Sequence, residues 1–265
     1  MPARLRTRFA PSPTGYLHIG HARAAAAAFG WAEANGAECL LRIEDIDPTR
    51  CRADYTDAIF EDLEWLGFHW PDPVRVQSEH RDDYAEVAER LAEMGVIYPC
   101  DLSRADVAEL TRNGIFRGRA VPGPRAPWRL DVRAAREVTG PLGYTDNGER
   151  MEVDFDAVSD EIVVRRDTYT TQGDGGEWGT SYFLACTHDD HLQGITHVVR
   201  GEDLREATPV QRILQALMGW EVPEYIHHPL VMEGERKLSK SDGDTAIREL
   251  RAAGLSPAEV LCRAS

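Results

Sequence analysis

The stretch that decides the fold lies near the N-terminus and reads LRTRFAPSPTGYLHIGH over residues 5–21. Its first part, Leu5–Phe9, is typical of a short β-strand. Ala10–Gly15 predicts a rigid turn, because proline fixes φ and glycine permits unusual backbone angles. The alanine-rich residues 20–35 predict a helix that ends at the next glycine. A strand, a turn and a helix therefore follow one another directly.

The same alternation continues outward from this stretch. Cys39–Ile43 is a compact apolar run, which is typical of a buried parallel strand. Helical spacing follows over residues 54–66 and 80–94, and each stretch stops at a glycine. This order predicts an α/β protein with a Rossmann-like, doubly wound parallel sheet, whose first half occupies residues 1–97.

The pattern changes over residues 98–190. Proline and glycine cluster at residues 121–127, and short alternating runs follow at Met151–Phe155 and Glu161–Arg165. These features predict an inserted α+β subdomain.

Strand–helix alternation then returns. Strands are expected at 196–200 and 225–231 around a helix at 208–218, so residues 191–240 are the predicted second half of the Rossmann domain. Two short helices, at 245–253 and 257–263, are expected within a short helical C-terminal segment, residues 241–265.

Composition limits the class of protein. The 265 residues contain no apolar run near the roughly 20 residues that cross a bilayer, and the N-terminus lacks the apolar stretch of a signal peptide. We therefore expect a cytoplasmic protein with no membrane association. The five cysteines are widely spaced without a CxxC motif, which argues against a disulfide framework and a complete thiolate zinc site.

The net charge of −15 does not indicate nucleic-acid binding, but one segment is strongly basic. Its only acidic residue is Asp131. Its arginines are Arg112, Arg117, Arg119, Arg125, Arg129, Arg133 and Arg136. Composition alone explains this segment equally well as a solvated loop or as a phosphate-binding surface.

Two short motifs are candidates for one nucleotide site. His18–His21 (HIGH) stands at a predicted helix start, where unpaired N–H groups and the helix dipole favour an anion. Gly20 would let a nucleotide approach the backbone, and the two imidazoles could donate hydrogen bonds to phosphate oxygens. Lys237–Ser241 (KLSKS) follows the last expected strand, and its lysines suit a pyrophosphate. Structural histidines or a solvated loop would explain either motif alone, whereas their combination indicates a nucleotide site.

Four motifs in this order resemble the class I aminoacyl-tRNA synthetases of the glutamate type. They are RFAPSPTG at 8–15, LHIGH at 17–21, RIEDID at 42–47 and GITHVVRGED at 194–203. The resemblance runs from about residue 4 to about residue 260. It implies that the α-carboxylate of glutamate attacks the α-phosphorus of ATP, forming glutamyl-adenylate and releasing pyrophosphate. Mg²⁺ is expected to travel with ATP.

The resemblance also implies roles for individual residues. Arg8 and Arg200 would hold carboxylate, Glu44 the ammonium group, and Tyr182 would supply a hydroxyl and a wall. Without the resemblance, these arginines would be interpreted as surface residues and Glu44 as a helix N-cap. The full implied glutamate-binding set is Arg8, Ala10, Ser12, Glu44, Tyr182 and Arg200. The implied ATP-binding set is His18, Gly20, His21 and Lys240, and the catalytic set is His18, His21 and Lys240 with Lys237 in support.

The resemblance narrows to the glutamyl-Q tRNA(Asp) synthetases, short paralogues without the anticodon-binding domain, because the sequence stops soon after Lys237–Ser241. Members of that family attach glutamate to the queuosine base of tRNA(Asp). The implied partners are glutamate, ATP and tRNA(Asp) carrying queuosine, and a monomer is expected. Two alternatives stay open: a catalytic half of a glutamyl-tRNA synthetase that charges the terminal adenosine, and a glutamate-adenylating enzyme with a non-tRNA acceptor.

The sequence departs from the short family at two places, which affect the predictions about zinc and about the acceptor of the glutamyl group. In YPCDL, residues 98–102, Leu102 stands at the second position of the family's Cys-x-Cys pair, and one cysteine cannot anchor tetrahedral zinc, so zinc is predicted absent. Asp242 and Gly243, after KLSKS, differ from the usual short-family sequence, which leaves the acceptor open.

Two further segments could have other functions. His188–His191 (HDDH) contains residue types that bind divalent ions, but the family's equivalent segment lines the pocket, so no metal site is expected. The resemblance implies that the basic segment faces nucleic acid. The speculative tRNA contacts are Arg112, Arg117, Arg119 and Arg125.

Overall fold

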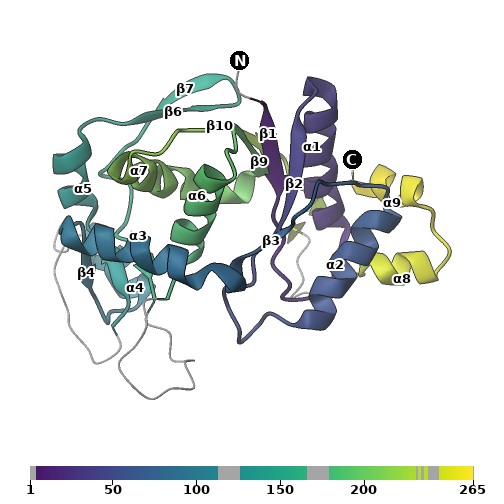
Figure 1. Cartoon of the computed structure of the whole chain (residues 1–265), viewed down its shortest axis with the longest axis horizontal. Coiled ribbons are helices and arrows are strands. Elements are labelled where there is room, and N and C mark those ends of the chain that lie inside the picture. The colour runs from purple at the N-terminus through teal and green to yellow at the C-terminus, as the bar shows by residue number, and fades with distance from the viewer. Residues whose placement is uncertain are drawn as a thin grey trace.

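The N-terminal stretch forms the expected strand, turn and helix, as Figure 1 shows. Strand β1 is Arg6–Phe9, helix α1 is Ile19–Asn35 and strand β2 is Glu38–Ile43. The computed structural model describes residues 4–112, 126–165, 179–230, 232–233, 236–237 and 245–264. Gly36 ends α1 at φ 59°, in the left-handed region that glycine adopts without a steric penalty.

The strands form two neighbouring sheets that are mainly parallel. The first has the order β1-β2-β3, with β3 at Arg75–Val76. The second has the order β7-β6-β10-β9, in which β9 and β6 run parallel to β10. The sheets adjoin where the N–H of Thr196 donates to the carbonyl oxygen of Arg6 at 3.0 Å. The bounds are β6 Gly143–Asp146, β7 Glu149–Glu152, β9 His197–Gly201 and β10 Glu224–His228.

Two hydrophobic cores cover opposite faces of these strands. Val199 packs into the core that contains α1, whereas its neighbour Val198 packs into the other core, because side chains alternate along a strand. The buried face of α1 consists of small side chains, which let the helix lie close to the strands. These side chains are Ala22, Ala25, Ala28 and Ala32. The arrangement confirms the predicted α/β fold with a doubly wound parallel sheet.

Helices complete the layers around the strands. On the α1 side these are α2 (Ala53–Trp65) and the C-terminal helices α8 (Ile247–Ala252) and α9 (Pro257–Ala264). On the other side lie α3 (Arg81–Glu93), α6 (Tyr182–Leu192) and α7 (Thr208–Met218). Two 3₁₀ helices occupy Gln77–His80 and Glu202–Ala207.

The region after residue 97 contains a third, antiparallel sheet with the order β4-β5-β8. Its bounds are β4 Ile97–Pro99, β5 Trp128–Leu130 and β8 Ile162–Val164, accompanied by α4 (Arg104–Arg112) and α5 (Val132–Thr139). The expected insertion, residues 98–190, also supplies β6 to the second sheet, and its expected end falls within α6. The four-part division of the chain therefore stays a prediction.

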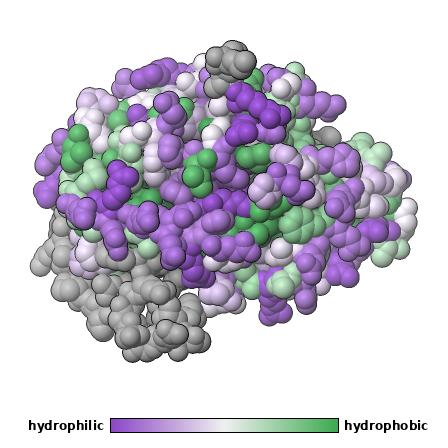
Figure 2. Space-filling model, in the orientation of Figure 1, coloured by the Kyte–Doolittle hydropathy of each residue, from purple (hydrophilic) through white to green (hydrophobic). Residues whose placement is uncertain are grey.

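The remaining hairpin is short, with β11 at Met232–Glu233 and β12 at Arg236–Lys237. Figure 2 shows a largely hydrophilic face with hydrophobic residues scattered over it. Across the ranges that the structure describes, no helix combines the length and the apolar content needed to cross a membrane.

Candidate functional site

A cleft of about 690 Å³ opens where β1, β2 and β9 end and α1 begins. The carboxyl ends of parallel strands are the usual ligand-binding edge of an open α/β sheet. The predicted site residues that line this cleft are Arg8, Ala10, Ser12, His18, Gly20, His21, Glu44, Tyr182 and Arg200. Lys240 lies outside the described residues, and only the backbone of Lys237, in β12, is described. The topology therefore brings together every predicted glutamate-binding residue and the HIGH motif.

The two histidines of the HIGH motif are held by the first turn of α1. The N–H of Gly20 donates to Nδ1 of His18 at 3.0 Å, and the N–H of His18 donates to Nδ1 of His21 at 3.1 Å. The ring centroids lie 3.9 Å apart. Because each Nδ1 accepts a hydrogen bond, each neutral imidazole carries its proton on Nε2. Both rings can therefore donate from Nε2 to an anion.

Gly20 has a second reason to be glycine. A Cβ at this position would lie 2.8 Å from Cε1 and 3.0 Å from Nδ1 of His18. The sequence predicted that Gly20 allows close approach of a nucleotide, whereas the structure shows that it also leaves room for the His18 ring. At Gly30, in the same helix, an added Cβ would meet nothing within 4 Å.

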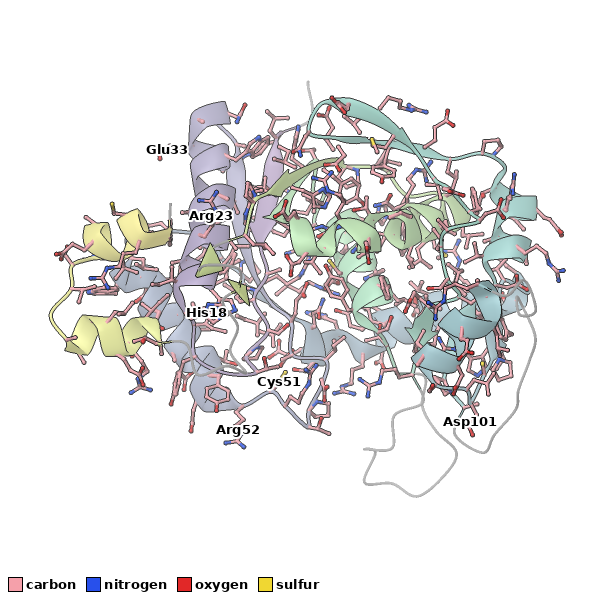
Figure 3. All side chains as sticks on the ribbon, turned by 180° about the vertical axis from the view of Figure 1, so that it is seen from behind. His18, Arg23, Glu33, Cys51, Arg52 and Asp101 are labelled. Atoms are coloured by element: carbon pink, nitrogen blue, oxygen red, sulfur yellow. The ribbon has the colours of Figure 1, made fainter. Side chains whose placement is uncertain are left out.

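The C-terminal segment returns to the start of α1. Ala246 pairs with His18 in an isolated antiparallel bridge, and the N–H of Ile247 donates to the carbonyl oxygen of Leu17 at 2.8 Å. Arg23 donates through Nη1 to the carbonyl oxygen of Ala264 at 3.1 Å. Figure 3 shows His18 and Arg23 on α1, with the C-terminal helices beside it. The chain that follows the KLSKS motif is therefore bound directly to the HIGH motif.

The other end of the cleft contains a buried network of charges. Arg42 donates from Nη1 to Oδ1 of Asp190 at 2.8 Å and from Nη2 to Oε1 of Glu44 at 3.1 Å. Arg8 donates from Nε to the same Oδ1 of Asp190 at 2.9 Å. The thiol of Cys186 lies between the arginines, 3.3 Å from Nη2 of Arg42 and 3.7 Å from Nη2 of Arg8. Arg42 thus links Glu44 to the carboxylate that holds Arg8.

The carboxylates of this network have opposite pKa shifts. Burial alone would raise the pKa of Asp190, but the guanidinium groups of Arg8 and Arg42 outweigh it and hold that pKa below its ordinary value. For Glu44, burial dominates and raises the pKa, although Arg42 and Arg8 partly offset it. Burial also raises the pKa of the Cys186 thiol to about 12, so that the thiol stays protonated. Glu44 is therefore a buried carboxylate that a further cation would stabilise.

Asp189, next to Asp190, binds a different set of donors. Its carboxylate accepts from Nε of Arg75 at 2.8 Å, from Nε2 of Gln77 at 2.9 Å and from the hydroxyl of Tyr84 at 2.9 Å. Within the described ranges no group of three or more His, Cys, Asp or Glu side chains could hold a metal ion. The two central residues of the HDDH segment therefore bind arginines, and the prediction that the segment holds no metal stays a prediction.

Arg200 reaches the cleft from the end of β9. It donates to Thr208 Oγ1 at 2.7 Å, Gln211 Oε1 at 2.8 Å, the Tyr182 hydroxyl at 3.3 Å and His227 Nε2 at 3.2 Å. Sequence reasoning did not identify His227 or Cys186, and it gave no individual role to Arg42 of the RIEDID motif or to Asp190 of the HDDH segment. Helical spacing offers one signal, because Cys186 and Asp190 follow Tyr182 at intervals of four along α6.

One arginine of the basic segment, Arg129, does not lie on the surface where the sequence predicted it. Arg129 is 1% exposed and donates to the carbonyl oxygens of Asp160 and Leu102, at 2.9 Å each. It stabilises the interior of the antiparallel sheet and cannot be part of a phosphate-binding surface. Arg112 is exposed at the end of α4. The other predicted tRNA contacts, Arg117, Arg119 and Arg125, lie outside the described residues.

Cys100 occupies the position where the short family has its zinc-binding pair. It is fully buried and packs with Tyr98 and Val107, against which Leu102 and Leu110 also pack. Among the described residues these neighbours are mainly apolar, and Cys100 belongs to no group of three or more side chains that could hold a metal ion. The absence of zinc nevertheless stays a prediction.

The chain has relatives among known proteins, and the matched residues include those that line the cleft. The sequence profile described as tRNA synthetases class I (E and Q), catalytic domain, matches residues 4–121 and 132–263. The chain is 40% identical to the glutamyl-Q tRNA(Asp) synthetase of Rhodobacter capsulatus, over 96% of this chain and 97% of that protein. It is 39% identical to glutamate–tRNA ligase 2 of Gluconobacter oxydans, over 97% of this chain and 60% of that protein.

A solved structure has the same fold. The glutamate–tRNA synthetase of Elizabethkingia anophelis superposes with a TM-score of 0.71 and 28% identity, over 91% of this chain and 53% of that chain. The present chain thus spans about half the length of that enzyme. The profile match and the two identities show that the chain belongs to the class I tRNA synthetases of the glutamate and glutamine type and carries their catalytic domain.

Proposed function

We propose that this chain activates glutamate with ATP and transfers the glutamyl group to the queuosine base of tRNA(Asp). Its family is one of ATP-dependent ligases that act on tRNA. The observation that carries the activation step is the single cleft, in which the paired histidines and the side chains of Arg8, Glu44 and Arg200 meet.

The first reaction is adenylation. The α-carboxylate of glutamate attacks the α-phosphorus of ATP, a new O–P bond forms, and the bond to pyrophosphate breaks. Such a reaction needs positioning and charge stabilisation rather than a covalent enzyme intermediate. His18 and His21 donate from Nε2 to phosphate oxygens, Lys240 binds the departing pyrophosphate, and Lys237 supports it. Mg²⁺ enters on the triphosphate oxygens of ATP.

The buried charges select the amino acid. Arg8 and Arg200 hold the carboxylates of glutamate, and Glu44 holds the ammonium group, while Ala10, Ser12 and Tyr182 form the wall. The raised pKa of Glu44 supports this assignment, because an incoming ammonium would compensate its buried charge. The polar contacts of Arg200 with Tyr182 and Gln211 keep its guanidinium at the cleft.

No short motif specifies the acceptor of the glutamyl group, so the assignment of the acceptor rests on the relatives. The 40% identity with a glutamyl-Q tRNA(Asp) synthetase supports the queuosine base of tRNA(Asp). The 39% identity with a glutamate–tRNA ligase supports a second candidate, the terminal adenosine of tRNA. We assign the tRNA contacts to the basic segment, namely to Arg112, Arg117, Arg119 and Arg125.

Two assays test the proposal. ATP–pyrophosphate exchange is measured with each amino acid, with and without tRNA, and exchange is expected with glutamate. Transfer of labelled glutamate is then measured to tRNA(Asp) with and without queuosine, each also ending in 2′,3′-dideoxyadenosine. We expect transfer only to the queuosine-containing tRNA, whatever its terminal ribose. Transfer that requires the terminal hydroxyls would establish the second candidate, and exchange without transfer to any tRNA would point to a non-tRNA acceptor.

A further inference from the structure

An Asp–His–Arg chain crosses three neighbouring strands behind the cleft. Asp146 lies on β6, His227 on β10 and Arg200 on β9. Nδ1 of His227 lies 2.8 Å from Oδ1 of Asp146, and Nε of Arg200 lies 3.2 Å from Nε2 of His227. All three side chains are buried, and His227 is not among the residues that line the cleft. Within the part of the chain that the structure describes, His227 therefore reaches the cleft through Arg200, which lines it.

The chemistry of these three groups allows one protonation state. A guanidinium is always a donor, so Nε2 of His227 must accept the hydrogen bond from Arg200. The proton of the neutral imidazole is then on Nδ1, from which it is donated to Asp146. Asp146 also forms an ion pair with Arg205, which holds its carboxylate in place. The carboxylate therefore selects the His227 tautomer that accepts from Arg200.

We infer that His227 is a positioning residue for glutamate activation, which aims the guanidinium of Arg200 at the substrate carboxylate through the tautomer that Asp146 selects. This inference rests on the proposed function, in which Arg200 binds glutamate. It goes beyond that function, because it states that residues on β10 and β6 hold Arg200 in place. It also gives glutamate binding a defined dependence on pH.

The surroundings of His227 determine the sign of that dependence. Arg200 faces it from β9 and Asp146 from β6. Asp146 is paired with Arg205, which lies in the 3₁₀ helix after β9. Thr208 faces His227 from α7, and Tyr225 stacks on it with centroids 6.1 Å apart. Burial, the largest effect, lowers the pKa of His227 below its ordinary 6.5; Asp146 raises it and Arg200 lowers it. His227 is thus neutral at pH 7.

Acid reverses this state. As the pH falls below 6.5 through the lowered pKa, His227 gains a proton, Nε2 becomes a donor, and Arg200 loses its acceptor and faces a like charge. The KM for glutamate should therefore be low at neutral pH and rise in acid, whereas the KM for ATP should not follow.

Matched variants test the inference by pyrophosphate exchange between pH 5 and 8. His227→Ala is expected to raise the KM for glutamate about 10- to 100-fold at pH 7.5, the usual effect of losing a buried hydrogen bond to a charged group. His227→Gln should recover most of this loss, since its carbonyl can accept from Arg200 while its NH₂ donates to Asp146. It should also make the acid rise in KM shallower, because an amide does not titrate and only the contribution of Glu44, whose pKa is raised by burial, remains.

His197→Gln is the control. His197 lies on β9, its pKa is also lowered by burial, and it stacks on Trp31 rather than on a cleft residue. This variant should keep the wild-type dependence of the glutamate KM on pH. Asp146→Asn supplies a further test, since an amide no longer selects one tautomer, and it should raise the KM for glutamate.

Imidazole ¹⁵N NMR tests the tautomer without any substrate. At pH 7.5 the expected signals of His227 are a protonated Nδ1 and an unprotonated Nε2, and the reverse pattern or an imidazolium would overturn the inference. An unchanged KM for glutamate in folded His227→Ala, or an acid rise in His227→Gln as steep as that of the wild type, would overturn it as well. Wild-type protein that lacks glutamate-dependent exchange would instead refute the proposed function, so the two failures are distinguishable.

Discussion

The two ends of the cleft are built in different ways. At the nucleotide end, His18, Gly20 and His21 contact one another within a single helical turn, through backbone N–H groups and through the two imidazole rings, which are tilted by 57°. At the amino-acid end, Arg42 and Asp190 come from elements 148 residues apart and are both buried. A local motif thus forms the first end, whereas tertiary packing of charges forms the second. Changes at the first end should mainly affect chemistry, and changes at the second should also affect stability.

The largest expected effect comes from breaking the buried charge network with Arg42→Met. Removing one partner of a buried ion pair leaves an uncompensated charge, here on Glu44, while Asp190 keeps only Arg8, and costs about 3–5 kcal/mol of unfolding free energy. Urea denaturation measures this loss.

The control is Arg251→Met, at the exposed ion pair that Arg251 forms with Glu61 at 2.9 Å. Exposed pairs contribute about 0–1 kcal/mol, so this variant should unfold close to the wild type. Similar losses of unfolding free energy in the two variants would contradict the claim that buried charges stabilise the amino-acid end of the cleft.

Lys240→Ala tests the nucleotide end next. Loss of one group that stabilises transition-state charge typically lowers kcat by about 10²–10³-fold. Pyrophosphate exchange should fall accordingly, while glutamate binding measured by calorimetry stays near the wild-type value. Lys237→Ala should have a smaller effect on exchange. An unchanged exchange rate in Lys240→Ala would refute the role of this lysine.

Gly20→Ala should change the position of the His18 ring without changing the fold. The added Cβ would push the His18 ring away, and a displacement of this size can lower the rate by up to about 100-fold. Thermal stability should change little.

Gly30→Ala is the matched control in the same helix, where the Cβ would meet open space. Alanine is the better helix former by about 0.5–1 kcal/mol, so this variant should be slightly more stable and fully active. If both variants kept wild-type exchange rates, the steric account of Gly20 would be wrong.

The smallest expected effect is that of Cys186→Ser. The thiol lies 3.3–3.8 Å from Arg42, Arg8 and Asp190, and such long sulfur contacts are weak. The KM for glutamate should rise by less than about fivefold, equivalent to about 1 kcal/mol. The exposed Cys262 offers the control, Cys262→Ser, with an unchanged KM. A rise in the glutamate KM well above fivefold would mean that Cys186 contacts the substrate.

Much of the fold was predictable because its signals are local. Periodicity and glycine positions identified α1 to within one residue, and the same reasoning located α2, α3, α7 and both C-terminal helices. The motifs identified the residues that the cleft brings together.

The supporting residues were not predictable, because their roles depend on contacts between distant segments. The sequence put Arg42 in a buried strand and at the start of the RIEDID motif, but it did not give the partner of this arginine, because only the fold brings Asp190 to it. His227 needs both Asp146 and Arg200, from two other strands. Arg129 shows the converse error, since composition put it on a basic surface although backbone carbonyl oxygens bind it in the interior.

The bridge between His18 and Ala246 has a consequence for biosynthesis. The HIGH motif leaves the ribosome more than 200 residues before its bridge partner Ala246 and before Ala264, whose carbonyl oxygen accepts from Arg23. Strand β1 and helix α1 can associate early, whereas contacts of such high sequence separation form late. A nascent chain therefore acquires its complete nucleotide end only after translation has passed Ala264.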